Sequence, residues 1–311
     1  MEKRKKSAGI EKKQSRWGLI FVTPAVLFFS VFSFYPIINA LIESFFDKRV
    51  LSNAPPKFVG FQNYTYIFDV SRYGNPMSFL NSLRATFVFT LGTFIPLLVC
   101  SLLFAVLVTS LRKAVYKKIF QIAFYTPAVL SSVVAAAIWL LIFDPRGLGN
   151  YWLNTLLRTP GVDYKWLMDS TMTQISTMIV YFWKYIGYFI ILFITGLLSI
   201  PPVVYEAALI DGANRFQIFW RITLPLLKPT VVLVSIMSML QCLKTFSTQY
   251  LFTQNGASLA PINVVTLNIY QTGIKLQRIG RASAMSIVLF LIMLFLTWLQ
   301  FRGSKADETS Y

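Results

Sequence analysis

The stretch EAALIDGANRFQIFWRITLPLLKP, residues 206–229, mixes charged, aromatic and small residues between two long apolar runs. The residues before Asp211 have the composition of a short helix, and Gly212 can adopt the left-handed conformation that ends a helix. Asn214 is of a residue type that caps the start of a helix, and Pro225 interrupts the chain further on. The stretch therefore predicts a helix, a turn and a second helix in a loop between two membrane spans.

The second helix of this loop is predicted to be amphipathic. Its aromatic residues fall on one face at helical spacing, and its polar residues fall on the opposite face. The first face carries Phe216, Phe219, Trp220 and Thr223, and the second carries Asn214, Gln217 and Arg221. Two interpretations fit this pattern: a connector that lies on the membrane surface, or a docking surface for a partner protein.

The rest of the chain is strongly apolar. Of its 311 residues, 56% are apolar and 13% are charged, whereas a soluble domain has about 25% charged residues. A helix needs about 20 apolar residues to cross a hydrocarbon core about 30 Å thick, and six segments are long enough. They run approximately over residues 17–46, 82–110, 119–143, 173–199, 229–252 and 282–302. The sequence thus predicts an all-α integral membrane protein with six transmembrane helices.

These spans predict a simple domain organisation. We expect a basic cytoplasmic tail over residues 1–16, a six-helix transmembrane domain over residues 17–302 and a cytoplasmic tail over residues 303–311. The polar loop occupies about residues 200–228 of the transmembrane domain. The first span is longer than the apolar part of a cleaved signal peptide, which has roughly 7–15 residues, so we expect it to be retained.

Lysine and arginine residues indicate the orientation of the chain, because they accumulate on the cytoplasmic side of membrane proteins. The tail before Trp17 holds seven of them, and the loop LRKAVYKK, residues 111–118, holds four. Short segments on this side hold 16 of the 29, and the longer loops on the other side hold 10. Both termini and the loop of residues 206–229 are therefore expected in the cytoplasm. This topology, with contacts to anionic lipid, explains the formal net charge of +17 without nucleic-acid binding.

The residue content argues against covalent chemistry. The chain has no histidine, and its two cysteines, Cys100 and Cys242, lie in separate apolar runs, so we expect no metal site and no disulfide framework. It also has no G-x-x-x-x-G-K-[ST] phosphate loop, so we expect no ATP site and no cofactor in this chain. A membrane enzyme would need clustered His, Cys or carboxylates, and an ion-coupled transporter would need acids within its spans. We expect no catalytic residues, and an ion-coupled secondary transporter is kept as an alternative.

The loop of residues 206–229 resembles the EAA loop of the permease subunits of ABC importers, in the branch that takes up sugars. The matching residues are Glu206, Ala207, Ala208, Asp211, Gly212, Ala213, Phe219, Ile222, Leu224, Pro225 and Pro229. Further stretches similar to the maltose-type, binding-protein-dependent sugar permeases cover residues 34–47, 58–68, 124–150 and 183–213. The chain departs from the family at residues 253–258, where TQNGAS stands in place of T-x-GGP.

The resemblance implies a transport subunit of the cell (inner) membrane that works in an assembly. The implied partners are a second homologous permease subunit, two cytoplasmic ATPase subunits that bind ATP and magnesium, and an extracytoplasmic solute-binding protein. The loop would insert into the ATPase, with carboxylates from Glu206 and Asp211 facing basic groups. The residues expected to couple the permease to the ATPase are Glu206, Ala207, Ala208, Asp211, Gly212, Ala213, Phe219 and Pro225.

The resemblance also implies a saccharide as the cargo, with glycerol phosphate or another non-sugar solute as the alternative. Aligned on FSTQYLFT, residues 246–253, the pocket positions of the family fall at Ser238, Cys242 and Thr245. Ser238, Gln241 and Thr245 also recur on one face of a helix. The expected substrate path comprises Tyr185, Gly187, Tyr188, Ser238, Gln241, Cys242, Lys244, Thr245 and Gln249.

Two lysines raise the question of the charge of the cargo. Lys184 and Lys244 lie within predicted spans that contain no acid. A cation at membrane depth costs about 2.5 kcal/mol or more, and an acidic oligosaccharide as cargo would offset part of that cost. Contact of each lysine with backbone carbonyls, with an acid of a partner subunit or with water is the competing explanation.

Overall fold

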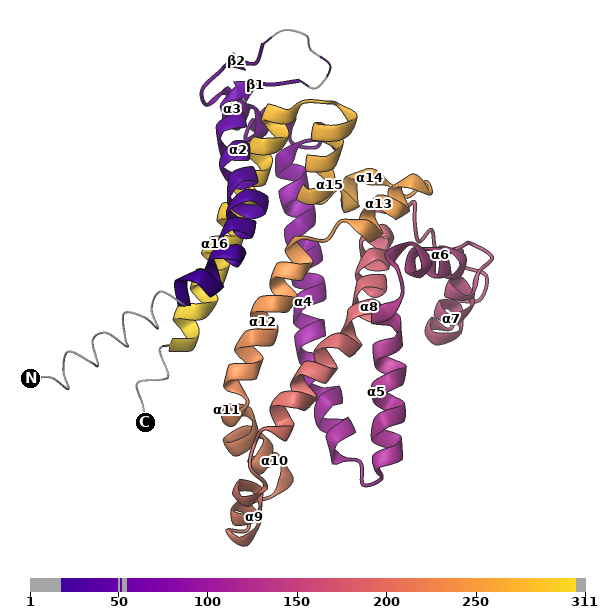
Figure 1. The fold of residues 1–311 in the computed structure, drawn as a ribbon. Helices are drawn as coiled ribbons and strands as arrows, with labels where there is room; N and C mark the ends of the chain where they lie inside the picture. Colours follow the sequence, from indigo (N-terminus) through magenta and orange to yellow (C-terminus); the bar gives the residue numbers. More distant parts are fainter. Residues whose placement is uncertain (1–17, 50, 52–54, 306–311) are drawn as a thin grey trace, which may run out of the picture. The chain divides into compact units, whose positions relative to one another are not determined.

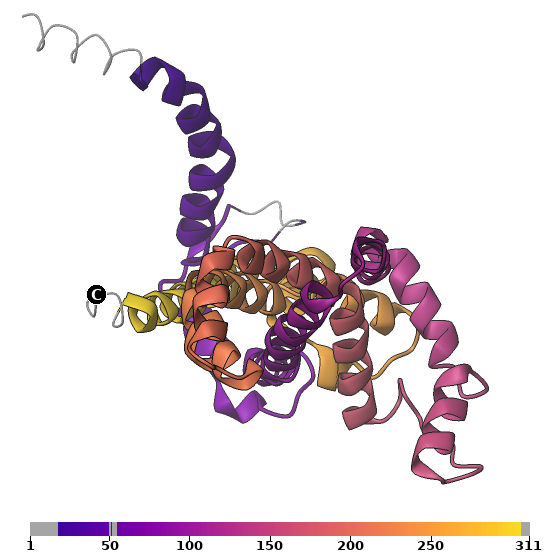
Figure 2. The same cartoon turned by 90° about the horizontal axis from the view of Figure 1, so that it is seen from below.

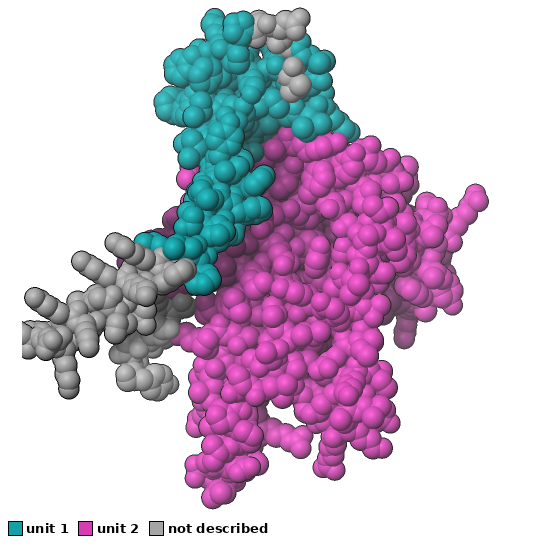
Figure 3. All heavy atoms as spheres, in the orientation of Figure 1, with its two compact units in different colours: residues 1–67, 272–287 teal, residues 68–271, 288–311 magenta. Residues whose placement is uncertain are grey.

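The computed structural model describes residues 18–49, 51 and 55–305. The predicted N-terminal tail, residues 1–16, and the last six residues of the C-terminal tail lie outside the described residues. The chain forms two compact units, coloured separately in Figure 3. Unit 1 comprises Met1–Ile67 and Thr272–Ile287, and unit 2 comprises Phe68–Gln271 and Val288–Tyr311. The described chain is mostly helical, which confirms the predicted all-α class (Figure 1).

The predicted spans correspond to long apolar helices. Five helices of the described chain are long and apolar enough to cross a membrane, and there are six candidates if one bent pair forms a single span. The five are Gly18–Glu43, Phe79–Ser110 (α4), Ser170–Leu198 (α8), Lys228–Gln254 (α12 and α13) and Ile279–Gly303, within α16. The bent pair consists of α5, Ala114–Val129, and α6, Ser132–Ile142.

The third predicted span is not one straight helix. In place of a continuous helix over residues 119–143, α5 and α6 meet at an angle of 99°. Pro127 lies in the last turn of α5, and the Ser131 hydroxyl caps α6 by accepting a hydrogen bond of 3.2 Å from the backbone N–H of Val134. The 16 residues of α5 extend about 24 Å at 1.5 Å per residue, so α5 by itself is shorter than the hydrocarbon core.

The fifth predicted span is also interrupted. Helix α12 covers Lys228–Leu243, α13 covers Ser247–Gln254, and the residues between them are not helical. One backbone carbonyl freed by this break, that of Thr245, accepts a hydrogen bond from the Thr266 hydroxyl. The expectation that Ser238, Gln241 and Thr245 share one helical face is therefore wrong at Thr245, because α12 ends before it.

Helices α4, α5, α8 and α12 form the core of unit 2. Leu97 of α4, Phe189 and Phe193 of α8, and Val234 of α12 are each 0% exposed and belong to one apolar cluster. The backbone of α5 approaches α8 closely at Gly187, where a Cβ atom would lie 1.9 Å from the carbonyl oxygen of Phe124. Helix α6 and α7, Leu148–Leu157, project to one side of this bundle in both views (Figures 1 and 2).

Two short helices cover the end of unit 2 at which α4 begins. These are α14, Leu259–Ile262, and α15, Val265–Tyr270 (Figure 1). The Thr86 hydroxyl of α4 accepts a bond of 2.9 Å from the backbone N–H of Val265, and the Asn268 amide donates to the Ser82 hydroxyl at 2.8 Å. The first bond satisfies a backbone N–H of this irregular segment, and the second satisfies a buried side-chain amide, so both allow the segment to be buried.

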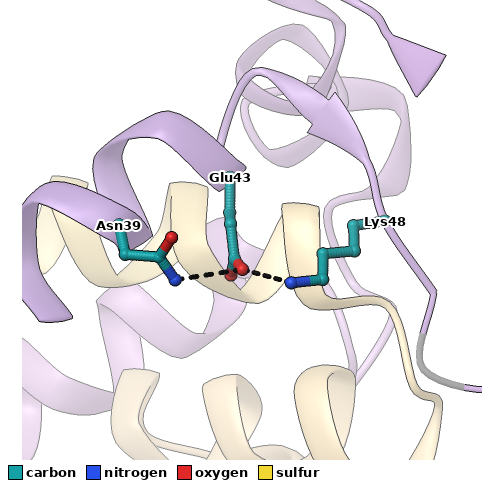
Figure 4. A network of polar contacts seen from close by, with 3 residues as sticks. All are labelled: Asn39, Glu43 and Lys48. Atoms are coloured by element: carbon teal, nitrogen blue, oxygen red, sulfur yellow. Dashed lines mark hydrogen bonds and ion pairs between the residues drawn. The ribbon is translucent and has the colours of Figure 1, made fainter. Parts of the chain in front are cut away.

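Unit 1 contains the N-terminal span, two short strands, a short helix and residues 272–287, which include the start of α16. Strand β1, Phe46–Asp47, pairs antiparallel with β2, Lys57–Phe58, and α3, Gln62–Ile67, follows. Helix α2, Tyr35–Glu43, ends in the acid nearest to the apolar part of the span. Figure 4 shows that the Glu43 carboxylate accepts a hydrogen bond of 3.1 Å from the Asn39 amide and forms an ion pair with Lys48.

Candidate functional site

A pocket of about 300 Å³ opens beside α8 at the two helix breaks. Its walls come from the start of α6, the middle of α8 and the junction of α12 and α13. The residues that line it are Ser132, Tyr181, Tyr185, Gln241, Lys244, Thr245, Phe246, Ser247 and Thr248. Helices α6 and α13 each begin at a break. Backbone N–H and C=O groups at these breaks are not all hydrogen-bonded within a helix, so they can face the pocket.

Aromatic rings form one wall of the pocket. Tyr181 and Tyr185 lie one helical turn apart on α8, with ring centroids 4.5 Å apart. Phe246 stands in the break and stacks on Tyr250, with centroids 5.3 Å apart and ring planes inclined by 14°. These rings offer flat apolar surface next to hydroxyl groups, an arrangement that suits ligands with both apolar and polar faces.

Lys184 lies directly behind this pocket. Only 5% of its surface is exposed, and its ammonium group donates a hydrogen bond of 2.8 Å to the hydroxyl of Ser132, which lines the pocket. The ammonium also stands 5.4 Å from the ring centroid of Tyr185. Throughout the described residues, no carboxylate forms an ion pair with Lys184 or Lys244. The pocket therefore has an excess of positive charge.

Gln241 contributes a hydrogen-bond acceptor without a partner. Its side-chain oxygen is buried and has no hydrogen bond within the described chain. A buried acceptor of this kind costs free energy unless a donor reaches it. A ligand hydroxyl in the pocket is one donor that would satisfy it.

The pocket gathers four of the nine residues of the predicted substrate path: Tyr185, Gln241, Lys244 and Thr245. Three others lie in the packed interior and are 0% exposed: Ser238, Cys242 and Gln249. The Ser238 hydroxyl donates to the backbone carbonyl of Val234 at 2.6 Å, and the Gln249 side chain accepts from the Thr245 hydroxyl at 2.9 Å. Gly187 packs against α5, and Tyr188 is half-buried against the apolar cluster of the bundle. For these five residues, contact with cargo stays a prediction.

Five lining residues were missed by the sequence analysis: Ser132, Tyr181, Phe246, Ser247 and Thr248. Tyr181 could have been found, because it lies one helical turn before Tyr185. The Ser131–Ser132 pair inside an apolar run is also a pattern that favours a helix start. The other three depend on the break after α12, for which the sequence offers neither glycine nor proline.

The loop after α8 forms the helix, turn and second helix that its sequence predicts. Helix α9, Pro202–Ile210, ends at a turn in which Gly212 has a φ of +76°. Asn214 caps α10, Arg215–Ile218: its side-chain oxygen accepts from the backbone N–H of Gln217 at 2.9 Å, and the Gln217 side chain accepts from that of Asn214 at 2.9 Å. A π-helical turn, Phe219–Thr223, and α11, Leu224–Leu226, lead into α12.

The predicted coupling residues divide between surface and interior. Six of them are exposed or partly exposed: Glu206, Ala207, Asp211, Gly212, Ala213 and Pro225. Ala208 is buried, and Phe219 is half-buried beside a cavity of about 320 Å³ that the ends of α4 and α8 also line. The predicted aromatic face is divided too, because Phe216 is 72% exposed whereas Thr223 is 6% exposed. The exposed part of the loop therefore combines carboxylates with large apolar side chains.

Among the residues that the structure describes, no three His, Cys, Asp or Glu side chains stand close enough to hold a metal ion.

Comparison with known proteins places this architecture in a family. The family described as binding-protein-dependent transport system inner membrane component matches residues 99–302. The arabinooligosaccharides transport system permease protein AraP of Bacillus subtilis (strain 168) is 33% identical over 290 residues, which are 92% of this chain and 87% of that protein. The sn-glycerol-3-phosphate transport system permease protein UgpA of Rhizobium meliloti (strain 1021) is 30% identical over 285 residues, 91% of this chain and 92% of that one.

A solved structure has the same fold. It is a crystal structure of a bacterial ABC transporter involved in the import of the acidic polysaccharide alginate, and one of its chains superposes with a TM-score of 0.78 at 22% identity. The superposition covers 96% of this chain and 99% of that chain.

Proposed function

Because the chain belongs to the family of binding-protein-dependent transport system inner membrane components, we propose that it is the membrane-spanning subunit of an ABC importer that carries a saccharide into the cytoplasm. It provides part of the path through the membrane and performs no covalent chemistry. The pocket beside α8 is the observation that carries the saccharide assignment. It combines aromatic faces from Tyr181 and Tyr185 with hydroxyl, amide and ammonium groups, which match the apolar and hydroxyl faces of a sugar ring.

The energy for transport comes from partner subunits in this proposal. Two cytoplasmic ATPases bind ATP and magnesium, and the loop of residues 200–228 docks on them. The exposed carboxylates of Glu206 and Asp211, and the exposed side chains of Ile210 and Phe216, support this role. Closure of the ATPases around nucleotide would shift the bundle between inward-open and outward-open states, because the two states bind the ATPases differently.

Two further partners complete the transporter. A second homologous permease subunit provides the other half of the path, and an extracytoplasmic solute-binding protein delivers the cargo. A related alginate transporter has been solved with an alginate pentasaccharide-bound periplasmic protein, which supports the second of these partners. The resemblance implies that the TQNGAS segment, residues 253–258, faces this binding protein. The segment ends α13 and turns at Gly256, which has a φ of +87°, and its sequence departs from the T-x-GGP pattern of the family.

The orientation of the chain is part of the proposal. Both termini and the loop of residues 200–228 face the cytoplasm, as the distribution of lysine and arginine predicts. Single cysteines at Ser7 and at Ser304, in a variant that lacks Cys100 and Cys242, should resist a membrane-impermeant maleimide in intact cells and react after the cells are opened. Reaction of either cysteine in intact cells would contradict this topology.

Reconstituted transport tests the function. The complete transporter in proteoliposomes should take up an oligosaccharide when the binding protein and ATP are supplied, and uptake should stop when the ATPase subunits are left out. Uptake that continues without ATPase and follows an ion gradient would instead support the ion-coupled alternative. Uptake of glycerol 3-phosphate but of no saccharide would support the alternative non-sugar cargo, for which the similarity to UgpA is the motivating observation.

A further inference from the structure

Among the residues that the structure describes, no carboxylate balances the charge of the buried lysine behind the pocket. Lys184 is 95% buried, and the polar atom it meets is a neutral hydroxyl, that of Ser132. A buried charge that is not paired is costly, and an anionic group that reaches the ammonium during transport would offset that cost. Lys244, at the end of α12, lines the pocket with an exposed side chain and has no ion-pair partner in the described part of the chain.

The hydroxyl of Ser132 links the Lys184 ammonium to the pocket. A serine hydroxyl has one donor proton and two acceptor lone pairs. The ammonium of Lys184 occupies a lone pair, and within the described residues the proton of Ser132 has no acceptor. Because Ser132 lines the pocket, its hydroxyl is held as a donor toward whatever molecule enters. A donor backed by an ammonium group prefers an anionic acceptor to a neutral one.

The two helix breaks add backbone N–H groups as further hydrogen-bond donors with partial positive charge. Helices α6 and α13 both begin at the pocket, at Ser132 and at Ser247, and the first backbone N–H groups of a helix carry partial positive charge. Ser131 caps α6, but Phe246, at the capping position of α13, provides no side-chain acceptor. In membrane transporters, the starts of broken helices commonly point at anionic substrate groups.

We propose that this pocket selects a cargo that carries an anionic group. Lys244 and the Ser132 hydroxyl, with Lys184 behind it, bind the anion, while Tyr181 and Tyr185 contact the sugar or polyol beside it. The lining residues include no aspartate and no glutamate that would repel such a group. This inference rests on the proposed function and narrows it: the anion is the carboxylate of a uronic acid residue or a phosphate ester.

Matched ligands test the proposal directly. Equilibrium binding to the complete purified transporter, without the binding protein, is measured for a uronic acid trisaccharide, for its carboxyl-reduced neutral counterpart and for glycerol 3-phosphate. We expect one anionic probe to bind at least about tenfold more tightly than the neutral trisaccharide, the size of one charge-assisted hydrogen bond. The trisaccharide arm and the phosphate arm distinguish the two sources of the anion.

Substitutions of pocket residues test whether the preference for anionic ligands comes from this pocket. Lys244→Met, Lys184→Met and Ser132→Ala should each reduce the anionic preference, by about tenfold for Lys244→Met, whereas Lys244→Arg should keep most of it. Lys165→Met, the same change at an exposed lysine outside the pocket, should leave it unchanged. Co-purification of the partner subunits at normal stoichiometry would show that the three pocket variants still fold and assemble.

The possible outcomes separate this proposal from the proposed function. Equal binding of the acidic and neutral trisaccharides, with no binding of glycerol 3-phosphate, would overturn the anionic preference and leave a saccharide permease. Tight binding of glycerol 3-phosphate alone would support the anionic pocket and overturn the saccharide cargo. Binding of neither anionic probe, or an anionic preference that survives both lysine substitutions, would overturn the proposal for this pocket.

Discussion

The loop of residues 200–228 and the pocket beside α8 differ in how far apart along the chain their essential contacts lie. The loop depends on neighbours: Asn214 and Gln217 cap a helix between them, and Gly212 alone makes the turn. The pocket brings Ser132, on α6, next to Lys184, on α8, and both next to the break after α12. The loop therefore keeps its shape through local bonds, whereas the pocket exists only when the helices are packed.

This difference predicts two kinds of mutant. Changes in the loop should interrupt transport while the bundle stays folded. Changes beneath the pocket should alter the stability of the bundle as well as the binding of cargo.

The largest effect is expected at the turn of the loop. Gly212 has a φ of +76° and nothing within 4 Å of the position of a Cβ, so Gly212→Val would strain the backbone without a steric clash. The left-handed conformation costs a non-glycine residue roughly 1–2 kcal/mol, and more for a β-branched one. We expect the loop to change shape and uptake to fall to background, with normal insertion and reduced co-purification of the ATPase. Glu206→Lys should also reduce uptake and co-purification of the ATPase, because it replaces a carboxylate that is expected to face basic groups with a positive charge.

A matched control for this change is Gly303→Val. Gly303 also has nothing within 4 Å of a Cβ and lies in helix α16, so valine should be tolerated there. Normal uptake and normal ATPase stoichiometry in both Gly212→Val and Glu206→Lys would show that the loop does not couple the bundle to the ATPase.

The next largest effect is expected beneath the pocket, at Gly187. An alanine Cβ there would lie 1.9 Å from the carbonyl oxygen of Phe124, so α5 and α8 must separate. Overpacking of this kind costs typically 1–3 kcal/mol, and we expect Gly187→Ala to lower the temperature at which the purified transporter unfolds. Unchanged thermal stability combined with altered cargo binding would assign Gly187 to the substrate path and not to packing.

A smaller effect is expected from the cap of α10. Asn214→Ala removes the side-chain acceptor for the backbone N–H of Gln217, and loss of such a cap costs typically about 1 kcal/mol. We expect the ATPase activity of the complete transporter to become partly uncoupled from uptake, while the unfolding temperature of the bundle stays the same. Asn214→Ser, which keeps a capping oxygen, should restore coupling. A drop in bundle stability would show that the loop is less independent than proposed.

The smallest effect is expected at Gln241. The side-chain oxygen of Gln241 is buried and has no hydrogen-bond partner among the described residues, so it should accept a hydrogen bond from a hydroxyl of bound saccharide. Gln241→Met should therefore weaken binding by the net value of one hydrogen bond, about 1 kcal/mol or roughly fivefold. Equilibrium binding of the neutral trisaccharide measures this change. If the affinity is unchanged and the transporter becomes more stable, the oxygen is an unsatisfied group of the interior and makes no contact with cargo.

The sequence predicted those features of the molecule that depend on local pattern. The membrane class follows from the length of the apolar runs, because only a helix satisfies its backbone within the bilayer. The helix, turn and helix of residues 202–218 follow from Gly212, Asn214 and Gln217, whose bonds span only a few residues. Four residues of the expected substrate path also line the pocket: Thr245 as a pocket position of the family, Gln241 and Lys244 as its polar neighbours, and Tyr185 as an aromatic surface.

Only the tertiary structure decided where the spans break and which polar residues face a cavity. The break after Leu243 is stabilised by Thr266, a distant residue whose hydroxyl satisfies the carbonyl of Thr245. Helical spacing placed Ser238 and Gln241 on related faces, yet Ser238 is fully buried against its own helix and Gln241 reaches the pocket. Periodicity states which residues share a face of a helix. Which neighbour covers that face depends on contacts between segments far apart in the sequence, and no local pattern encodes them.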